Sequence, residues 1–153
     1  MDQNATTVLL ACLGYQSDAE KAERFASVSA EEWRAAAELA QKQNLASLFL
    51  HRARRAGASL PGEIAENLER AHRRNTFQVM RLYEELNKLL KLFREKSIPV
   101  IVLKGAYLAE AVYDQIGLRT MRDIDLLVKK TTCPALSRNY WRRNTCRKNP
   151  IAW

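Results

Sequence analysis

The stretch IPVIVLKGAYLAEAVYDQIGLRTMRDIDLLV, residues 98–128, decides which fold this chain can form. It begins with a short apolar, β-branched run that stops at a glycine, and it ends with a second apolar run after Asp123 and Asp125. A short apolar run bounded by a glycine is typical of a buried strand, and its continuous apolar character predicts cover on both faces. The residues between the runs indicate a short helix over 106–113 and then a loop. We therefore expect strand, helix, loop and strand, with the second strand over 123–130.

The residues before this stretch have the periodicity of helices. SAEEWRAAAELAQKQN opens with Ser29 and has Glu32 three residues later, which is the pattern of a capping box. Apolar residues recur at helical spacing over 61–96, which predicts one long helix or two helices joined by a kink. The sequence therefore predicts an α+β fold, in which a helical N-terminal region (1–97) precedes the start of a mixed sheet (98–130).

The net charge of +8 is concentrated at the end of the sequence. Residues 129–153 hold seven of the 25 Lys and Arg residues and none of the 17 acidic ones, so the first 128 residues have a net charge of only +1. Residues 131–153 show no amphipathic period. One interpretation is a basic, aromatic arm in which Arg contacts nucleic-acid phosphates and Trp stacks on bases. The other interpretation, which we favour, is an out-of-frame translation, so nucleic acid is a possible but not a favoured partner.

Composition excludes several other classes of protein. No apolar run approaches the length that spans a bilayer, so we expect a cytoplasmic protein without a membrane partner. Cys12, Cys133 and Cys146 lack the spacing of metal ligands and are expected to be free thiols. The runs HRARR (51–55) and AHRR (71–74) are typical of solvated helix faces, with phosphate binding as the alternative.

The two aspartates near residue 124 predict a metal site. Residues i and i+2 of a strand point to the same side, so Asp123 and Asp125 should project together. Two carboxylates this close repel each other, and a divalent cation removes that penalty. Mg²⁺ prefers a few carboxylate oxygens together with substrate phosphates. The pair is therefore predicted to bind Mg²⁺.

The strand-to-helix turn at LKG predicts a site for an anion. Gly105 allows a phosphate to approach the backbone closely, and the free amides at the helix start, including that of Ala106, favour negative charge. Lys104 adds a positive charge, and Arg119 is placed to clamp a phosphate. A nucleoside triphosphate with Mg²⁺ needs both this anion site and the carboxylate pair.

The same residues resemble a known family. The stretch 98–128 is similar to the core motif of the uncharacterised nucleotidyltransferase family, within the polymerase-β-like nucleotidyltransferase superfamily, and the resemblance covers about residues 28–130. It implies Mg²⁺-dependent transfer of a nucleoside monophosphate from a nucleoside triphosphate to an acceptor that the sequence does not identify. By that resemblance Asp123 and Asp125 bind the metal, and Gly105 with its neighbours holds the triphosphate.

The sequence departs from the superfamily pattern in two places. Gly105-Ala106 stands where the superfamily often has Gly-Ser, so a phosphate-binding hydroxyl is absent. No Asp or Glu follows Asp125, although superfamily enzymes normally carry a third carboxylate on a later strand. We therefore expect a catalytic sheet that is incomplete, truncated or frameshifted after about residue 130, which puts enzymatic activity in doubt. The alternative function is a non-catalytic helical module whose basic tail binds nucleic acid or a partner.

Overall fold

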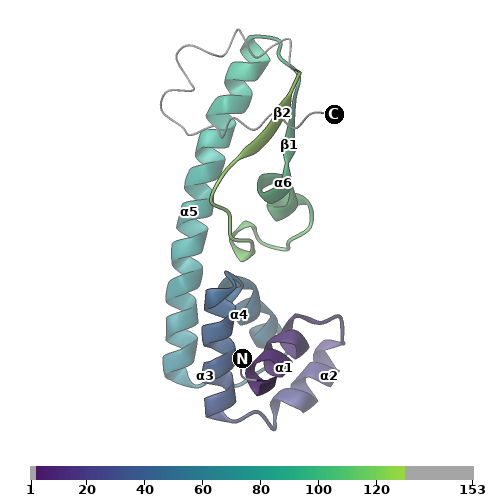
Figure 1. Cartoon of the computed structure of the whole chain (residues 1–153), viewed down its shortest axis with the longest axis vertical. Coiled ribbons are helices and arrows are strands. Elements are labelled where there is room, and N and C mark those ends of the chain that lie inside the picture. Colours follow the sequence, from purple (N-terminus) through teal and green to yellow (C-terminus); the bar gives the residue numbers. More distant parts are fainter. Residues whose placement is uncertain (1–2, 130–153) are drawn as a thin grey trace.

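The computed structural model describes residues 3–129 and shows an elongated molecule with a helical base at one end and a small sheet at the other (Figure 1). The predictions for the tail, residues 131–153, lie outside the described residues. The base contains α1 (Gln3–Leu13), α2 (Asp18–Phe25), α3 (Ala30–Lys42) and α4 (Ala46–Arg55), next to the first part of α5 (Gly62–Glu95). The remaining elements are β1 (Val100–Leu103), α6 (Lys104–Ala111), the 3₁₀ helix η1 (Ile116–Leu118) and β2 (Asp125–Val128). The α+β prediction is confirmed.

Capping boxes define the starts of two helices in the base. The Glu32 backbone N–H donates to Ser29 Oγ (3.2 Å), and the Ser29 backbone N–H donates to Glu32 Oε2 (2.9 Å), as the sequence predicts. Ser17 and Glu20 form a second box at the start of α2. Each box satisfies two backbone N–H groups that have no partner within the helix.

The first hydrophobic core joins α1, α2, α3, α4 and the beginning of α5. The Trp33 ring packs edge-on against Phe25 at a centroid distance of 5.2 Å and lies 5.9 Å from the ring of Phe49. Cys12 is a free, fully buried thiol, and burial raises its pKa to about 12. Cys12 thus lies on the buried face of α1, together with Val8 and Leu9.

Helix α5 is a single helix of 34 residues, about 51 Å long at 1.5 Å per residue. Its first half contributes Ile64 and Leu68 to the first core. Its second half contributes Val79 and Leu86 to a second core with α6 and Met121. The predicted boundary at residue 97 therefore follows a helix that belongs to both cores. Within residues 3–129, even this long helix carries too many charges to cross a bilayer, and no other helix could do so.

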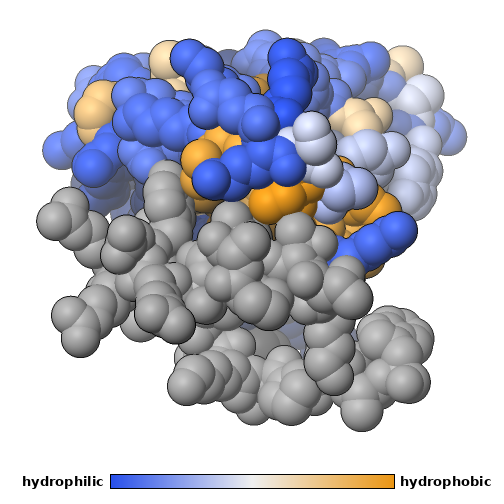
Figure 2. Space-filling model, turned by 90° about the horizontal axis from the view of Figure 1, so that it is seen from above, coloured by the Kyte–Doolittle hydropathy of each residue, from blue (hydrophilic) through white to orange (hydrophobic). Residues whose placement is uncertain are grey.

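The sheet consists of β1 and β2 in antiparallel register, from Val100 opposite Val128 to Leu103 opposite Asp125. One face packs on the end of α5 through Val100, Leu126 and Val128. On the other face the cross-strand partners Ile101 and Leu127 are 58% and 51% exposed. The prediction of cover on both faces of the first strand is therefore wrong for β1 within residues 3–129. Hydrophobic surface is visible among hydrophilic residues when the molecule is viewed from its sheet end (Figure 2).

The predicted element boundaries need two corrections near the motif residues. Helix α6 begins at Lys104, directly after β1, whereas the sequence predicted a start at residue 106. Strand β2 begins at Asp125, two residues later than predicted, so Asp123 precedes the strand. The residues just before β2, including Asp123, lie opposite the start of α6 and not opposite β1. They therefore have no neighbouring strand with which to form sheet hydrogen bonds.

Candidate functional site

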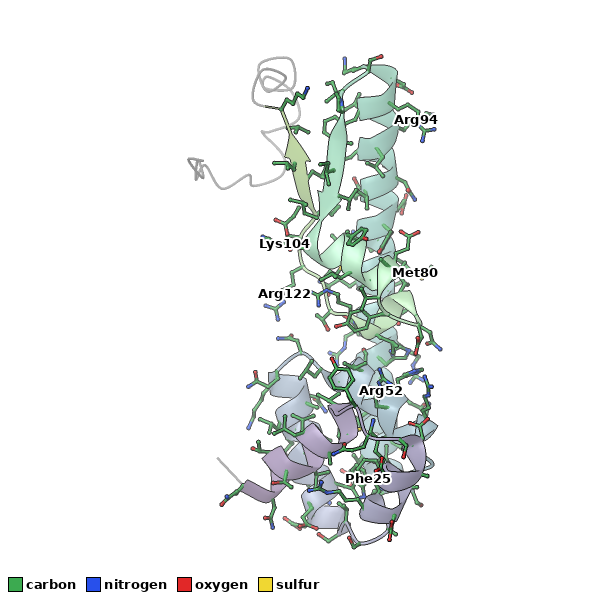
Figure 3. All side chains as sticks on the ribbon, turned by 90° about the vertical axis from the view of Figure 1, so that its right-hand side faces the viewer. Phe25, Arg52, Met80, Arg94, Lys104 and Arg122 are labelled. Atoms are coloured by element: carbon green, nitrogen blue, oxygen red, sulfur yellow. The ribbon has the colours of Figure 1, made fainter. Side chains whose placement is uncertain are left out.

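A cavity of about 470 Å³ lies where the α3–α4 turn faces the start of α6 and the segment leading into β2. Five of the predicted site residues line this cavity: Lys104, Gly105, Arg119, Asp123 and Asp125. The other lining residues are Tyr113 and residues of the helical base and of the segment 118–122. Figure 3 shows Lys104 and Arg122 on the same side of the molecule, between the sheet and the base.

The two carboxylates differ in their surroundings. The side chain of Asp125 is 32% exposed at the first position of β2, and Lys104 Nζ donates to its Oδ1 at 3.2 Å. Asp123 is exposed, and within residues 3–129 it has no hydrogen bond or ion pair. The cavity therefore holds one carboxylate with a lysine partner and one that is free to bind a cation.

The oxygen atoms that line the cavity suit the coordination chemistry of Mg²⁺. Two carboxylates on one cavity supply the hard oxygen ligands that this ion prefers, while water and phosphate oxygens complete its octahedron. In the part of the chain that the structure describes, no group of three or more His, Cys, Asp and Glu is arranged to hold a metal. The residues fit an ion that is shared with a substrate phosphate. Such an ion must compete with Lys104 for Asp125.

Lys104 itself has an unusual backbone. Its φ is +47°, in the left-handed region that side chains other than glycine rarely adopt, although it is the first residue of α6. This conformation turns the chain from β1 directly into the helix. Backbone strain of this kind costs about 1–3 kcal/mol and gathers at functional sites, where the surrounding structure holds it in place.

The next two residues, Gly105 and Ala106, have packing roles. A Cβ added at Gly105 would lie 3.2 Å from the Cγ and Sδ of Met121, so the glycine permits close packing as well as access from the cavity. Ala106 does not line the cavity. Its side chain is buried, and its carbonyl accepts a hydrogen bond of 2.5 Å from the Tyr83 hydroxyl, whose pKa is raised by burial. A nucleotide-binding role for Ala106 stays a prediction.

Arg119 brings an unpaired donor to the cavity. Its guanidinium carbon lies 5.9 Å from the centroid of the Tyr113 ring, which is within cation–π distance. Its Nε is buried and has no hydrogen-bond partner within the described residues. A buried N–H without a partner carries a desolvation penalty, which makes Arg119 an unusual residue in the cavity lining.

Sequence analysis missed the wall of the cavity that the helical base provides. Thr120 Oγ1 donates to the Asn44 carbonyl, and an Arg122 guanidinium N–H donates to Asn44 Oδ1, both at 3.0 Å. Asn44 has a φ of +59° and ends α3. An Asn just after a helix is a known sign of such an ending, but nothing local indicates that it contacts residues 76 to 78 positions away.

Helix α5 holds the segment 117–122, which lines the cavity from Leu118 onward, on the side away from the helical base. Asn75 Nδ2 donates to the Gly117 carbonyl at 2.7 Å, and Gln78 Nε2 donates to the Met121 carbonyl at 3.2 Å. A Cβ at Gly117 would lie 2.2 Å from Thr76 Oγ1, so only glycine fits there without a rearrangement. The segment 117–122 is thus held between α5 and the α3–α4 turn.

Comparison with known proteins places the chain in a family. A family model described as uncharacterised nucleotidyltransferase matches residues 29–139, which is more than half of the chain. The match includes every predicted site residue and continues past residue 130, where the predicted resemblance ended. No curated protein and no solved structure matches the chain. The chain belongs to the uncharacterised nucleotidyltransferase family.

Proposed function

We propose that this protein binds a nucleoside triphosphate with Mg²⁺ in the 470 Å³ cavity and transfers its nucleoside monophosphate to an acceptor. Asp123 and Asp125 hold the metal. Lys104, the backbone near Gly105 and Arg119 hold the phosphates. The acceptor's attacking oxygen forms a bond to the α-phosphorus, the bond from that phosphorus to the bridging oxygen breaks, and pyrophosphate leaves with the bond electrons. The proton of the acceptor passes to solvent.

One observation carries this proposal: residues that belong to two separate motifs line one cavity. Lys104 and Gly105 come from the strand-to-helix turn, and Asp123 and Asp125 come from the entry to β2. A triphosphate with its metal requires cationic and amide donors on one side and carboxylates on the other. The guanidinium of Arg119, which also lines the cavity, adds a cation suited to phosphate oxygens.

Metal-dependent nucleotide binding tests the proposal. The combined change Asp123→Asn and Asp125→Asn keeps the size of both side chains but removes both charges. We expect calorimetric titration with each of the four common nucleoside triphosphates to show binding that requires Mg²⁺. The double variant should bind the preferred nucleotide at least about tenfold more weakly, a loss of about 1.4 kcal/mol.

A matched control is available on the surface of α5. Glu84→Gln with Glu85→Gln also removes two neighbouring carboxylates, whose recorded partner is Lys88, outside the cavity. This control should leave nucleotide affinity unchanged. Equal affinity in Mg²⁺ and in EDTA, or equal losses in the two double variants, would refute the assigned roles of Asp123 and Asp125.

A further inference from the structure

A second depression lies on the surface between α3 and α5 and has a different chemical character. Its volume is about 880 Å³, and we call it the arginine groove. Its lining residues are Gln41, Asn67, Arg70, Arg73, Arg74 and Phe77. No Asp or Glu is among these described lining residues, so the groove is suited to an anion.

The α5 residues of the groove form one continuous stripe. Asn67, Arg70, Arg74 and Phe77 follow one another at spacings of three or four residues, which places them along one face of a helix. From Asn67 to Phe77 this stripe extends for about 15 Å along the helix axis at 1.5 Å per residue. A linear anion with charges at regular intervals matches this shape better than a single small ion.

Ion pairing distinguishes this stripe from the other basic run of the chain. In HRARR, Arg54 pairs with Glu69, and Arg55 pairs with both Asp18 and Asp114. That run is therefore largely neutralised by carboxylates.

The groove arginines are less neutralised. Arg70 donates to the amide oxygen of Asn67 at 2.7 Å, and within residues 3–129 neither Arg70 nor Arg74 pairs with a carboxylate. Arg73 lies 3.4 Å from Glu69, which is also the partner of Arg54. An approaching polyanion can therefore bind Arg70 and Arg74 without displacing a carboxylate, since the partner of Arg70 is the neutral amide of Asn67.

Phe77 adds an aromatic surface to this charged groove. Its side chain is 67% exposed, although large apolar side chains are usually buried. Single-stranded nucleic acids are bound by grooves that combine cations for the backbone with aromatic rings on which bases stack. A simple polyphosphate would use the arginines but would have no use for the ring.

Residues at the end of α3 line both the groove and the nucleotide cavity. Gln41 lines the groove, whereas Gln43 and Asn44 line the cavity. Between them stands Lys42, which is exposed and has no ion pair within the described residues. Lys42 thus adds an exposed cation next in sequence to residues that line the two depressions, and the cavity side of this turn carries Arg122, which donates to Asn44.

We propose that the arginine groove binds single-stranded nucleic acid and directs its end to the cavity as the acceptor of the transferred nucleotide. Binding in the groove stands on its own observations, whereas the acceptor role rests on the proposed function. Arg70 and Arg74 contact backbone phosphates, Arg73 adds to the positive field, and a base stacks on Phe77.

Fluorescence anisotropy of a labelled 12-nucleotide single-stranded RNA, and of DNA of the same sequence, tests the groove in the full chain. Arg70→Gln, Arg73→Gln and Arg74→Gln together should weaken binding of the preferred strand at least about tenfold in low salt. The slope of log affinity against log salt should fall by about 1.4, since the two phosphate contacts of Arg70 and Arg74 contribute about 0.7 each on a single strand. Circular dichroism checks that the variant keeps its helices.

The control variant also removes three positive charges, but it leaves the three arginines of the groove in place. Arg138→Gln, Arg142→Gln and Arg143→Gln together take three arginines from the basic C-terminal segment, and affinity should then stay within about twofold, because the phosphate contacts of the groove remain. If this control loses the oligonucleotide while the groove variant retains it, or if the two variants lose it equally, the groove is not the binding site.

The Phe77→Ala variant tests whether the groove recognises the bases of a nucleic acid or only the negative charges of a polyanion. Loss of a stacking partner should weaken oligonucleotide binding at least about fivefold, while binding of inorganic polyphosphate should not change. An equal effect on both ligands, or none on the oligonucleotide, would overturn the assignment of a nucleic acid.

The role of the bound strand as acceptor can be tested separately from nucleotide binding in the cavity. With the groove variant, Mg²⁺-dependent nucleotide binding should persist while transfer of a labelled nucleotide to the oligonucleotide end is lost. With Asp123→Asn and Asp125→Asn, the oligonucleotide should still bind while nucleotide binding is lost. Nucleotide binding by the wild type without any transfer to the bound strand would overturn the acceptor role and leave the nucleotide site standing.

Discussion

At the scale of single residues, Lys104 has two possible partners in one cavity. Its ammonium now lies 3.2 Å from Asp125, and a triphosphate in the cavity would offer it a stronger anion. The side chain is 71% exposed, so the present pair contributes little to stability. A lysine in this position can exchange a carboxylate for a phosphate at small cost.

Replacing Lys104 by Gln should change two affinities in opposite directions. Affinity for the Mg²⁺–nucleotide complex should fall about tenfold, because the phosphates lose a cation. Affinity for Mg²⁺ alone should rise, because Asp125 loses its competitor. Calorimetry with Mg²⁺ alone and with the complex measures both changes. If Lys104 only neutralises Asp125, both affinities will rise together.

The sequence predicted those cavity-lining residues that lie within one short motif. Asp123, Asp125, Lys104 and Gly105 are recognisable because their chemistry and their spacing are local. Asn44 and Arg122 are not recognisable in this way, because their contact joins positions 78 residues apart. Such a contact depends on how α3 and α5 pack, which local periodicity does not determine.

At the scale of elements, a helix start marked by a capping box was predictable, whereas the starts of α6, which has no side-chain cap, and of β2 were each predicted two residues away from their positions. The capping box at Ser29 is a local hydrogen-bond pattern, and it occurs where the sequence indicated. Strand β2 starts later than predicted, because a ladder requires a partner, and β1 ends at Leu103 opposite Asp125. The sequence after Pro61 was compatible with either one long helix or two helices joined by a kink. Uninterrupted packing on two cores, which is tertiary information, explains the single helix α5.

Ser29→Ala should lower the free energy of unfolding by about 1 kcal/mol, because the Glu32 N–H loses its acceptor at the start of α3. Urea unfolding followed by circular dichroism measures this change. Ser27→Ala is the control, since that exposed hydroxyl donates to the Arg24 carbonyl outside α3. Equal losses in the two variants would show that the box does not stabilise α3 specifically.

At the scale of the whole molecule, α5 makes the two hydrophobic cores depend on each other. Leu68 lies in the first core and Leu86 in the second, on one uninterrupted helix. Hydrogen bonds from Asn75 and Gln78 add a second connection between this helix and the cavity segment. The two cores should therefore unfold in a single transition.

Leu86→Ala tests this dependence. The change should destabilise the protein by about 2–5 kcal/mol through lost burial and a residual cavity. Trp33 fluorescence, in a background where Trp141 and Trp153 are changed to Phe, reports on the first core. Its urea midpoint should decrease together with that of circular dichroism. A Trp33 midpoint that stays at the wild-type value would mean that the cores unfold independently.

The continuity of α5 also fixes how the two walls of the cavity are rotated relative to each other about the helix axis. One wall belongs to the helical base and contains Asn44, and the other contains Asp123 and Asp125. Each residue of an α-helix turns the chain by about 100° and advances it by about 1.5 Å. One extra residue between Ala71 and Asn75 would rotate the second core, with Asp123 and Asp125, by that angle about α5 relative to Asn44 on the helical base. The number of residues in the middle of this helix is therefore as much a determinant of the site as the identity of the residues that line it.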